Sequence, residues 1–171
     1  MSLASRFAHD LRKRLEDRVR SYTWKVEYRL DRRNKECVDV AGHPSEGTER
    51  NSPVIFIEVE LRREDPVSNI LKVWRRALHG KQAPRTILIQ GFSRVYRSRK
   101  YHNRCIKGQC ARDFGKMMQE STHRKVSYIP VRMNYYPRAG SNEGNGARHD
   151  AAVRFGDTIA THLRKLHIPL N

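Results

Sequence analysis

The spacing of hydrophobic residues changes within the first 30 positions from a helical pattern to a strand pattern. Apolar residues recur every four positions at the start, with Lys and Arg between them, which is typical of a helix with one apolar side. We expect this helix to end near Tyr22. Residues 23–30 alternate apolar and polar side chains, which indicates a strand. The apolar side of the helix consists of Leu3, Phe7, Leu11, Leu15 and Val19.

Two further strands are predicted before residue 62. Residues 37–41 resume β character after a polar turn. Residues 54–61 alternate strictly, so that four aliphatic side chains lie on one face and Phe56, Glu58 and Glu60 on the other. Two carboxylates therefore share one face of an otherwise apolar strand.

A helix and a short strand complete the first half of the chain. Pro66 ends the preceding strand, Ser68 can cap a helix that runs to Gly80, and residues 85–92 form another apolar strand. We expect the buried stripe of this helix to be Ile70, Leu71, Trp74, Ala77 and Leu78.

The second half continues with the same two patterns. We expect a basic and aromatic loop over 93–104, a helix over 109–120 and a strand over 126–133. After a loop rich in Gly, Asn and Ser, Asp150 can cap a last helix. The apolar stripes of these two helices are Cys110, Phe114 and Met117 on the first, and Ala152, Phe155, Ile159, Leu163 and Leu166 on the second.

This order of elements predicts an α/β protein with a mixed β-sheet flanked by helices. A chain of 171 residues has the usual size of one domain, so we expect residues 1–171 to form a single domain. Both ends of the chain are predicted to be helical.

The net charge indicates the kind of binding partner rather than the fold. The formal net charge is +17, which favours an anionic partner, and a nucleic acid is the commonest polyanion. No apolar run is long enough to span a bilayer, so we expect no membrane partner. The three cysteines are an odd, sparse set and no signal-peptide region is visible, which favours the cytoplasm.

The charges are segregated along the chain. Nine of the 18 carboxylates fall within residues 31–65, whereas residues 85–138 carry thirteen Lys or Arg but only Asp113 and Glu120 as acids. A protein that only coats phosphates gains nothing from an acidic centre. The pattern therefore predicts a cation-binding spot beside an anion-binding surface.

Three carboxylates form the candidate site. Asp39 lies in a strand segment, and Glu58 and Glu60 lie on the next strand, so that antiparallel pairing can bring all three together. Hard divalent cations prefer oxygen ligands and assist phosphodiester hydrolysis. We therefore expect Asp39, Glu58 and Glu60 to bind Mg²⁺ or Mn²⁺.

These residues resemble the restriction-endonuclease-like, or PD-(D/E)XK, superfamily, whose signature is an Asp on one strand and Glu-x-Lys on the next. Here the match is Asp39 followed by Glu58-x-Glu60, with Val38 in place of the signature Pro and Glu60 in place of the usual Lys. Both departures occur as variants in that superfamily. The resemblance covers residues 1–92, whose predicted elements match its helix, three strands, helix and strand.

The resemblance implies a fold and an activity. The fold is a restriction-endonuclease-like αβββαβ core over about 1–92, followed by an α-β-α extension over about 93–171. The activity is that of a metal-dependent endonuclease, with Asp39, Glu58 and Glu60 at the metal. Some members carry the catalytic lysine on the helix after the motif strand, where Lys72 lies here. A solvated helix lysine is the competing interpretation of Lys72.

A basic and aromatic segment directly follows the strand at 85–92. Its cations suit phosphates and its rings suit exposed bases, which predicts a nucleic-acid-binding surface, although a solvated basic loop has the same composition. The residues that we expect to contact nucleic acid are Arg62, Arg63, Arg94, Arg97, Arg99, Lys100, Tyr101 and Arg104.

Two main functions remain open at this point, with a structural protein bound to ribosomal or other RNA as a third, weaker alternative. The first is a metal-dependent nuclease, with DNA favoured over RNA as its substrate and a homodimer as one compatible state. The second is a non-catalytic nucleic-acid-binding module, which the missing Glu-x-Lys lysine favours. His102, Cys105 and Cys110 do not have the spacing of a zinc site, and no phosphate loop or G-x-S-x-G motif is present.

Overall fold

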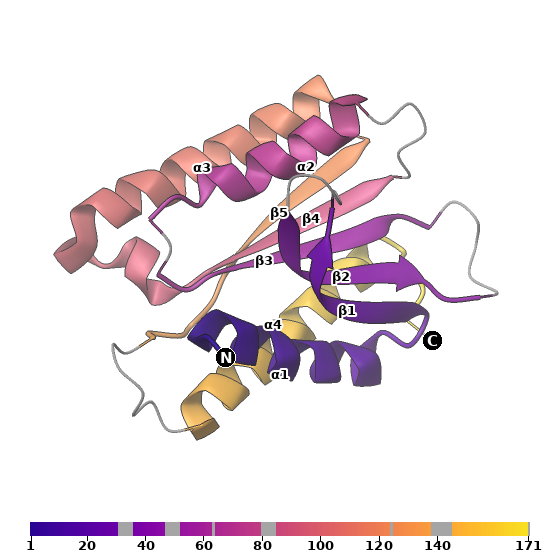
Figure 1. Ribbon diagram of the computed structural model, residues 1–171, viewed down its shortest axis with the longest axis horizontal. Coiled ribbons are helices and arrows are strands. Elements are labelled where there is room, and N and C mark those ends of the chain that lie inside the picture. The colour runs from indigo at the N-terminus through magenta and orange to yellow at the C-terminus, as the bar shows by residue number, and fades with distance from the viewer. Residues whose placement is uncertain are drawn as a thin grey trace.

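In the part of the chain that the structure describes, five strands form one mixed sheet (Figure 1). This computed structural model describes residues 1–30, 36–46, 52–62, 64–79, 85–123, 125–137 and 145–170. The strands lie in chain order across the sheet; the first three are antiparallel neighbours, and the last three are parallel. They are β1 (Tyr22–Arg29), β2 (Cys37–Pro44), β3 (Val54–Glu60), β4 (Thr86–Phe92) and β5 (Val126–Arg132).

Helices cover both faces of the sheet (Figure 1). On one face lie α1 (Leu3–Arg18) and α4 (Asn145–Lys165), and on the other lie α2 (Val67–His79) and α3 (His102–Ser121). Two short 3₁₀ turns, η1 (Arg94–Arg97) and η2 (Arg99–Tyr101), join β4 to α3. The α/β class and the flanking helices that the sequence predicts are thus confirmed.

The central strand β3 is buried along its whole length and separates two hydrophobic cores. Its Ile55, Ile57 and Val59 belong to the core under α1 and α4, whereas Phe56 belongs to the core under α2 and α3. This is the alternation that the sequence predicts. The carboxylates of Glu58 and Glu60 consequently point from a fully buried strand toward α2.

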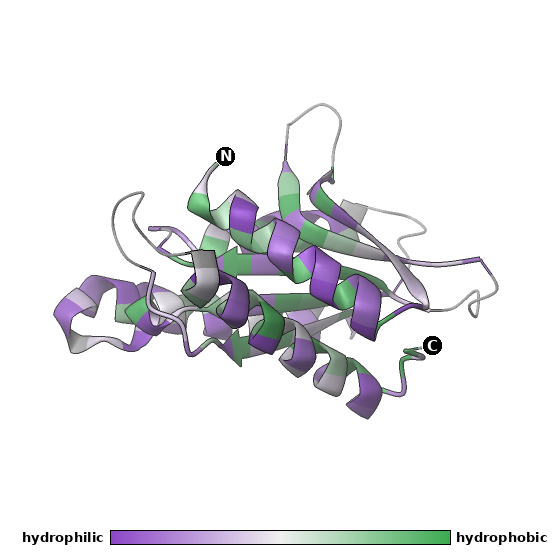
Figure 2. Ribbon diagram, turned by 90° about the horizontal axis from the view of Figure 1, so that it is seen from below, coloured by the Kyte–Doolittle hydropathy of each residue, from purple (hydrophilic) through white to green (hydrophobic). Residues whose placement is uncertain are grey.

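Hydropathy follows these layers. Figure 2 shows the α1 and α4 side of the molecule, where hydrophobic and hydrophilic residues alternate along the helices and the strands behind them are largely hydrophobic. The buried side of α1 includes Phe7, Leu11 and Leu15, as the four-residue spacing predicts. None of the described helices is long and apolar enough to cross a membrane.

Some predicted boundaries are wrong for local reasons. The first helix ends at Arg18 rather than near Tyr22, because Tyr22 already pairs with Pro44 in the sheet. The second helix is capped by Asp65, not by Ser68: Asp65 Oδ1 accepts the backbone N–H groups of Val67 at 3.2 Å and Ser68 at 3.3 Å.

The second half departs further from prediction. The loop expected over 93–104 consists of η1, η2 and the start of α3, which begins at His102 instead of 109. The last helix begins at Asn145, so Asp150 lies inside it and does not cap it. Residues 138–144, in which part of the predicted loop lies, fall outside the described residues.

The apolar stripes predicted for α2 and α3 are only partly buried. Leu71 and Leu78 of α2, and Phe114 and Met117 of α3, are exposed, as is Cys110. On α3 the reason is that the helix turns small residues toward the sheet. Its buried residues are Gly108, Ala111, Gly115 and Met118.

Gly115 is required for the close approach of α3 to β5. A Cβ atom at this position would lie 2.2 Å from Cε1 of Tyr128. We expect Gly115→Ala to lower the free energy of unfolding by about 1 to 3 kcal/mol, because overpacking outweighs the gain in helix propensity. Urea denaturation measures this difference. Gly146→Ala in α4 is the matched control, since its Cβ would meet no atom of the described residues within 4 Å, and equal effects of the two variants would contradict this account.

Candidate functional site

Pairing of β2 with β3 brings Asp39 and Glu58 together. Val40 pairs with Ile57, so the next residues beyond this end of the ladder are Asp39 on β2 and Glu58 on β3. Asp39 Oδ2 accepts the backbone N–H of Val59 at 2.7 Å, which fixes its carboxylate against β3. Two of the three predicted acidic residues therefore lie side by side.

Lys72 of α2 contacts Glu58 from above the sheet. Its Nζ lies 2.5 Å from Glu58 Oε1, and the two side chains are 10% and 1% exposed. The same ammonium group donates a hydrogen bond to the carbonyl oxygen of Cys37 at the start of β2. Lys72 is thus a nearly buried cation that joins α2 to β2 and β3, rather than a solvated helix lysine.

Glu60 is bound by side-chain amides. Its Oε1 accepts hydrogen bonds from Asn69 Nδ2 at 2.6 Å and from Gln90 Nε2 at 2.7 Å. Gln90 Nε2 also donates to the carbonyl oxygen of Pro66 at 2.9 Å, and the Tyr128 hydroxyl donates to Gln90 Oε1 at 2.8 Å. A buried polar network therefore runs from β3 through β4 to β5 under α2 and α3.

Sequence reasoning missed the partners of Glu60. A detectable signal for Gln90 was its place as the polar residue in the apolar run of β4, and for Asn69 it was its place beside the apolar stripe of α2. Neither residue type is a usual metal ligand or catalytic base, so a search for carboxylates passes over both.

Burial dominates the electrostatics of Glu58. Removal from water raises the pKa of Glu58 well above its ordinary value of 4.5, and the neighbouring charge of Asp39 raises it further, whereas Lys72 acts in the opposite direction. Among the described residues, Glu58 Oε2 has no hydrogen-bond partner. A buried carboxylate with a strongly shifted pKa and a vacant oxygen is a candidate for a functional group.

Some of the oxygen ligands that a divalent metal ion needs are present in this site. Asp39 and Glu58 supply adjacent carboxylates, and Glu58 Oε2 has the oxygen chemistry that Mg²⁺ and Mn²⁺ prefer. Within the described ranges, no group of three or more His, Cys, Asp or Glu side chains is arranged to hold a metal ion. Asp39 and Glu58 are thus the two carboxylates that would hold such an ion, while Glu60 Oε1 accepts hydrogen bonds from amides.

A cluster of exposed arginines lies where the parallel strands end, on the same side of the molecule as Glu60. We call this surface, with the neighbouring residues Arg62, Lys100, Tyr101 and Arg104, the basic edge. Arg94 and Arg97 follow the end of β4, and Arg132 ends β5. Partial burial lowers the pKa of Arg97, and so do the neighbouring positive charges of Arg132 and Arg94. Because β3, β4 and β5 are parallel, their carboxyl ends lie side by side, and the arginines therefore lie at the same end of the strands as Glu60.

Two tyrosines extend this basic edge. The rings of Tyr101 and Tyr136 lie 6.3 Å apart, and the guanidinium of Arg104 lies 5.5 Å from the Tyr101 ring centre. A hydrogen bond from Tyr136 lowers the pKa of Tyr101, as do the charges of Lys100, Arg62 and Arg104. Tyr136 was not predicted, because it follows β5 and is distant in sequence from the basic segment.

The structure thus gathers most of the predicted nucleic-acid contacts. Arg62, Lys100, Tyr101 and Arg104 form one group and Arg94 and Arg97 another. Arg63 lies outside the described residues, and of Arg99 only the backbone, in η2, is described.

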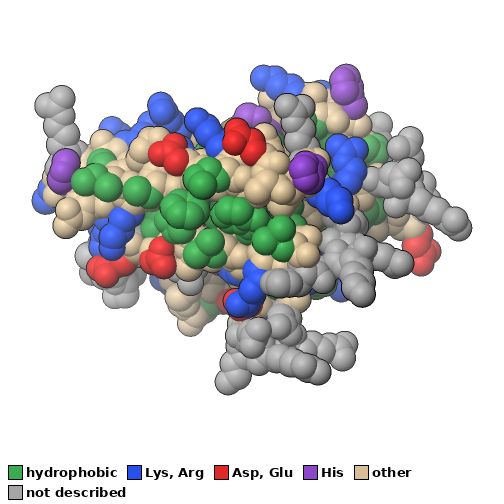
Figure 3. All heavy atoms as spheres, turned by 90° about the horizontal axis from the view of Figure 1, so that it is seen from above, with side chains coloured by type: hydrophobic (Ala, Val, Ile, Leu, Met, Phe, Trp, Pro, Cys, Tyr) green, Lys and Arg blue, Asp and Glu red, His purple; other side chains and the backbone are tan. Residues whose placement is uncertain are grey.

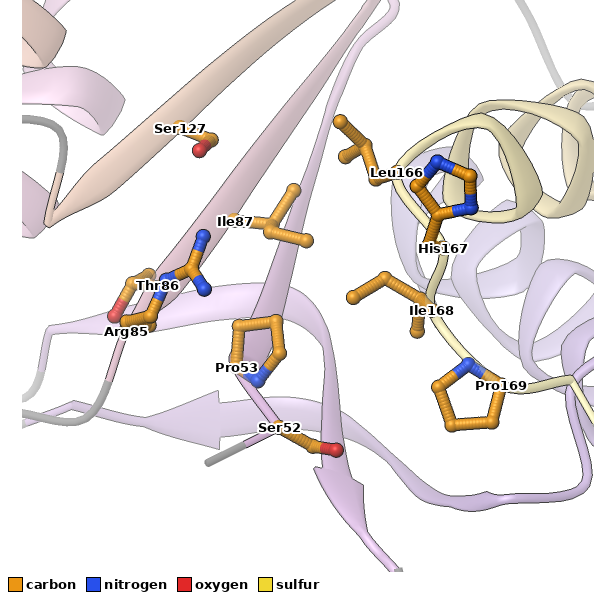
Figure 4. Close-up of a pocket in the computed structure, with 10 residues that line it drawn as sticks. All are labelled: Ser52, Pro53, Arg85, Thr86, Ile87, Ser127, Leu166, His167, Ile168 and Pro169. Carbon is orange, nitrogen blue, oxygen red and sulfur yellow. The ribbon is translucent and has the colours of Figure 1, made fainter. Parts of the chain in front are cut away.

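A cavity of about 190 Å³ lies at the opposite edge of the sheet (Figure 4). Its walls come from the starts of the parallel strands and from the segment after α4. No carboxylate is among the ten residues that line it, so it is separate from the acidic site. Its lining residues are Ser52, Pro53, Arg85, Thr86, Ile87, Ser127, Leu166, His167, Ile168 and Pro169.

The raised pKa of Glu58 predicts a pH-dependent stability. A carboxyl with a raised folded-state pKa stabilises the protein below its unfolded value of 4.5, and this contribution is lost as the pH rises through the folded value. We expect Glu58→Gln to gain stability relative to the unchanged protein as the pH rises above 4.5, because it cannot ionise. Urea unfolding of both proteins across this range measures the difference. A constant difference in unfolding free energy would contradict the shift.

The chain was compared with protein-family models, curated proteins and solved structures. No protein-family model matches the chain, no curated protein matches it, and no solved structure matches it.

Proposed function

We propose that this protein is a metal-dependent nuclease with a restriction-endonuclease-like fold. The observation that carries the proposal is the convergence of Asp39, Glu58 and Lys72 at one end of β3, next to a basic surface. The order of elements over α1 to β4 supports the fold, because it is the helix, three strands, helix and strand of the superfamily that the acidic motif resembles.

The proposal gives each residue of the site a task. Asp39 and Glu58 would hold Mg²⁺ or Mn²⁺, which when bound lowers the pKa of a water molecule and neutralises charge on the transferring phosphate. Lys72 provides a second positive charge for the same phosphate. Glu60 helps to orient the site, because its hydrogen bond to Asn69 fixes the register of α2, and Lys72 lies one helical turn further along.

In this proposal the phosphate of the substrate competes with Glu58 for the ammonium group of Lys72. Glu58 is 1% exposed and Lys72 lies against it, so in this proposal the ammonium group has to leave before the carboxylate can hold a metal ion. A phosphodiester that approaches along the basic edge carries the negative charge that can draw Lys72 away from Glu58. Binding of the substrate and opening of the site are then one event.

The basic edge binds the polymer in this proposal. Arg62, Arg94, Arg97, Lys100 and Arg104 contact phosphates, with Arg63 and Arg99 as further expected contacts. The rings of Tyr101 and Tyr136 offer stacking surfaces for bases. DNA is the favoured substrate, and cleavage of RNA in the assays below would extend the substrate class.

A non-catalytic nucleic-acid-binding module is the second candidate. It is favoured by the observation that each acidic residue already has a partner within the chain: a backbone N–H for Asp39, an ammonium for Glu58 and two amides for Glu60. Such a protein would bind through the same basic edge and leave the phosphodiester intact.

The nuclease assay separates the two candidates. We expect plasmid DNA to be cut with Mn²⁺ and not with EDTA, and Glu58→Gln to reduce the cleavage rate by about 100-fold or more, because it removes a charged metal ligand. The same reactions with single-stranded DNA and RNA define the substrate. Gel electrophoresis of the products measures the rates.

Glu46→Gln is the matched control, because it makes the same change at an exposed residue after β2. Retained cutting in this control together with lost cutting in Glu58→Gln supports the nuclease. DNA binding without metal-dependent cutting in the unchanged protein would contradict the nuclease and support the binding module.

Binding of nucleic acid by the basic edge predicts a particular dependence of affinity on salt concentration. We expect Arg94→Ala to reduce the slope of log K against log salt concentration by about one, because one phosphate contact is lost. Fluorescence anisotropy with labelled DNA at several salt concentrations measures this slope. Arg85→Ala is the control, since Arg85 is exposed at the opposite edge of the sheet. Equal slopes for the two variants would show that the basic edge is not the binding surface.

A further inference from the structure

The cavity of Figure 4 lies between the starts of the parallel strands and the segment after α4. Residues 166–169 form one of its walls, and Ile87 of β4 and Ser127 of β5 lie on the other. These two residues pair across the sheet, so their side chains point to the same face. In the next row on this face, Ile89 pairs with Ile129. The polar side chain of Ser127 thus stands where the neighbouring row has an aliphatic one.

The wall after α4 is anchored to the residues before β1. The backbone N–H of Arg20 donates to the carbonyl oxygen of Leu170 at 2.8 Å, and the Ser21 hydroxyl donates to the carbonyl oxygen of Pro169. Ile168 also packs against the hydrophobic core under α1 and α4. A wall that is fixed in this way forms a site before a ligand arrives, which lowers the cost of binding.

His167 occupies a position that helices commonly give to glycine. Its φ is 57°, in the left-handed region, directly after α4. The His167 N–H donates to the carbonyl oxygen of Arg164 at 3.0 Å, and the Ile168 N–H donates to that of Leu163 at 3.1 Å, which is the pattern of a Schellman cap. Left-handed backbone is unfavourable for a residue with a Cβ atom, so glycine would suit this cap better. The histidine instead supplies a ring N–H donor at the cavity.

Hydrogen-bond donors line the cavity from four segments of the chain. Arg85 before β4 provides a guanidinium, which extends toward the space beside Ile87 (Figure 4). His167 provides an imidazole, and Ser52 and Ser127 provide hydroxyls. Among the described residues that line the cavity there is no carboxylate to compete for the guanidinium. Because a guanidinium binds a carboxylate or a phosphate through two parallel N–H bonds, the polar side of the cavity fits an oxyanion.

The rest of the lining is apolar and limits the size of a ligand. Ile87 and Ile168 project from opposite walls (Figure 4), and Pro53 lies beside them. The exposed hydrophobic side chains of α2 and α3 lie on the other face of the molecule (Figure 3), so the apolar lining is a separate group. The cavity holds about 190 Å³. This is below the range of about 300–1,000 Å³ that is usual for drug-sized ligands, which favours a ligand smaller than a nucleotide.

The surface beside the cavity is positively charged. A second hollow shares Ile168 with it and is lined by the exposed Arg20 and Arg164. Asp17 and Arg18 also line this hollow, and cations still outnumber acids there when Arg18 is assigned to its ion pair with Asp157. An excess of positive charge raises the local concentration of small anions.

We propose that this cavity binds a small phosphate monoester with an apolar body. The three terminal oxygens of its phosphate accept hydrogen bonds from Arg85, His167 and the serine hydroxyls, whereas a carboxylate has only two oxygens for these donors. The apolar body contacts Ile87 and Ile168. The cavity lies at the opposite end of the parallel strands from the basic edge, so this inference is independent of the proposed nuclease activity.

Isothermal titration calorimetry in a buffer without phosphate tests the proposal, on the full chain freed of nucleic acid. We expect phenyl phosphate to bind about tenfold or more tightly than inorganic phosphate, because its ring enters the apolar side, and phenol not to bind. Arg85→Ala should weaken phenyl phosphate binding by about tenfold or more. Arg29→Ala is the matched control, since Arg29 is exposed at the other end of the sheet, where it pairs with Cys37.

His167→Gly separates binding from folding. Glycine suits the left-handed position, so the temperature of thermal unfolding should stay the same or rise, while the affinity for phenyl phosphate should fall by about threefold or more. Absence of saturable phenyl phosphate binding, equal effects of Arg85→Ala and Arg29→Ala, or an unchanged affinity in His167→Gly would each overturn the proposal.

A terminal phosphate of nucleic acid is the other source of the same chemical group. Fluorescence anisotropy compares an oligonucleotide that carries a 5′-phosphate with the same oligonucleotide that carries a 5′-hydroxyl. We expect the two to bind equally, because the cavity is too small for a nucleotide. Tighter binding of the phosphorylated form, with a difference that Arg85→Ala removes, would assign the cavity to a nucleic-acid end and overturn the small ligand.

Discussion

The fold depends on how two carboxylates are accommodated on a strand that has no access to water. All seven residues of β3 are buried, and Glu58 and Glu60 point to the same side of the sheet. A buried charge is costly unless it is paired and hydrogen-bonded. Helix α2 supplies both partners, with Asn69 against Glu60 and Lys72 against Glu58.

The spacing of these partners fixes α2 on the sheet. Two residues along a strand cover roughly 6.7 Å, and three residues along a helix place two side chains on the same side within roughly 4.5 Å. Both pairs form together only when α2 has one register and one direction over β3. Gln90 and Tyr128 extend the same network across β4 and β5, so the polar interior also orients the neighbouring strands. A polar network of this kind is a source of specificity in packing as well as a candidate for chemistry.

The sequence predicted the order of the first six elements and the face of β3 that carries the acids, because the alternation at residues 54–61 and the four-residue spacing of α1 are direct consequences of backbone geometry. It did not predict that α3 turns Gly108, Ala111 and Gly115 inward, because an apolar stripe of larger residues looked like the buried side. Small residues pack where a ring such as that of Tyr128 approaches, and this depends on a strand distant in sequence.

The candidate site was likewise predicted only in part from the sequence. Asp39, Glu58 and Lys72 were found from residue type and position, but the amide partners of Glu60 and the contact of Tyr136 with Tyr101 arise from tertiary packing. Sequence reasoning finds the groups that do chemistry more readily than the groups that hold them in place.

A crystal soaked in Mn²⁺ tests the central claim most directly. Anomalous diffraction at the manganese edge locates the ion without reference to activity. The account predicts a peak between the carboxylates of Asp39 and Glu58, with Lys72 Nζ moved away from Glu58 Oε1. An undisturbed Lys72–Glu58 pair, with no peak beside it at a manganese concentration that supports binding at other sites, would contradict it.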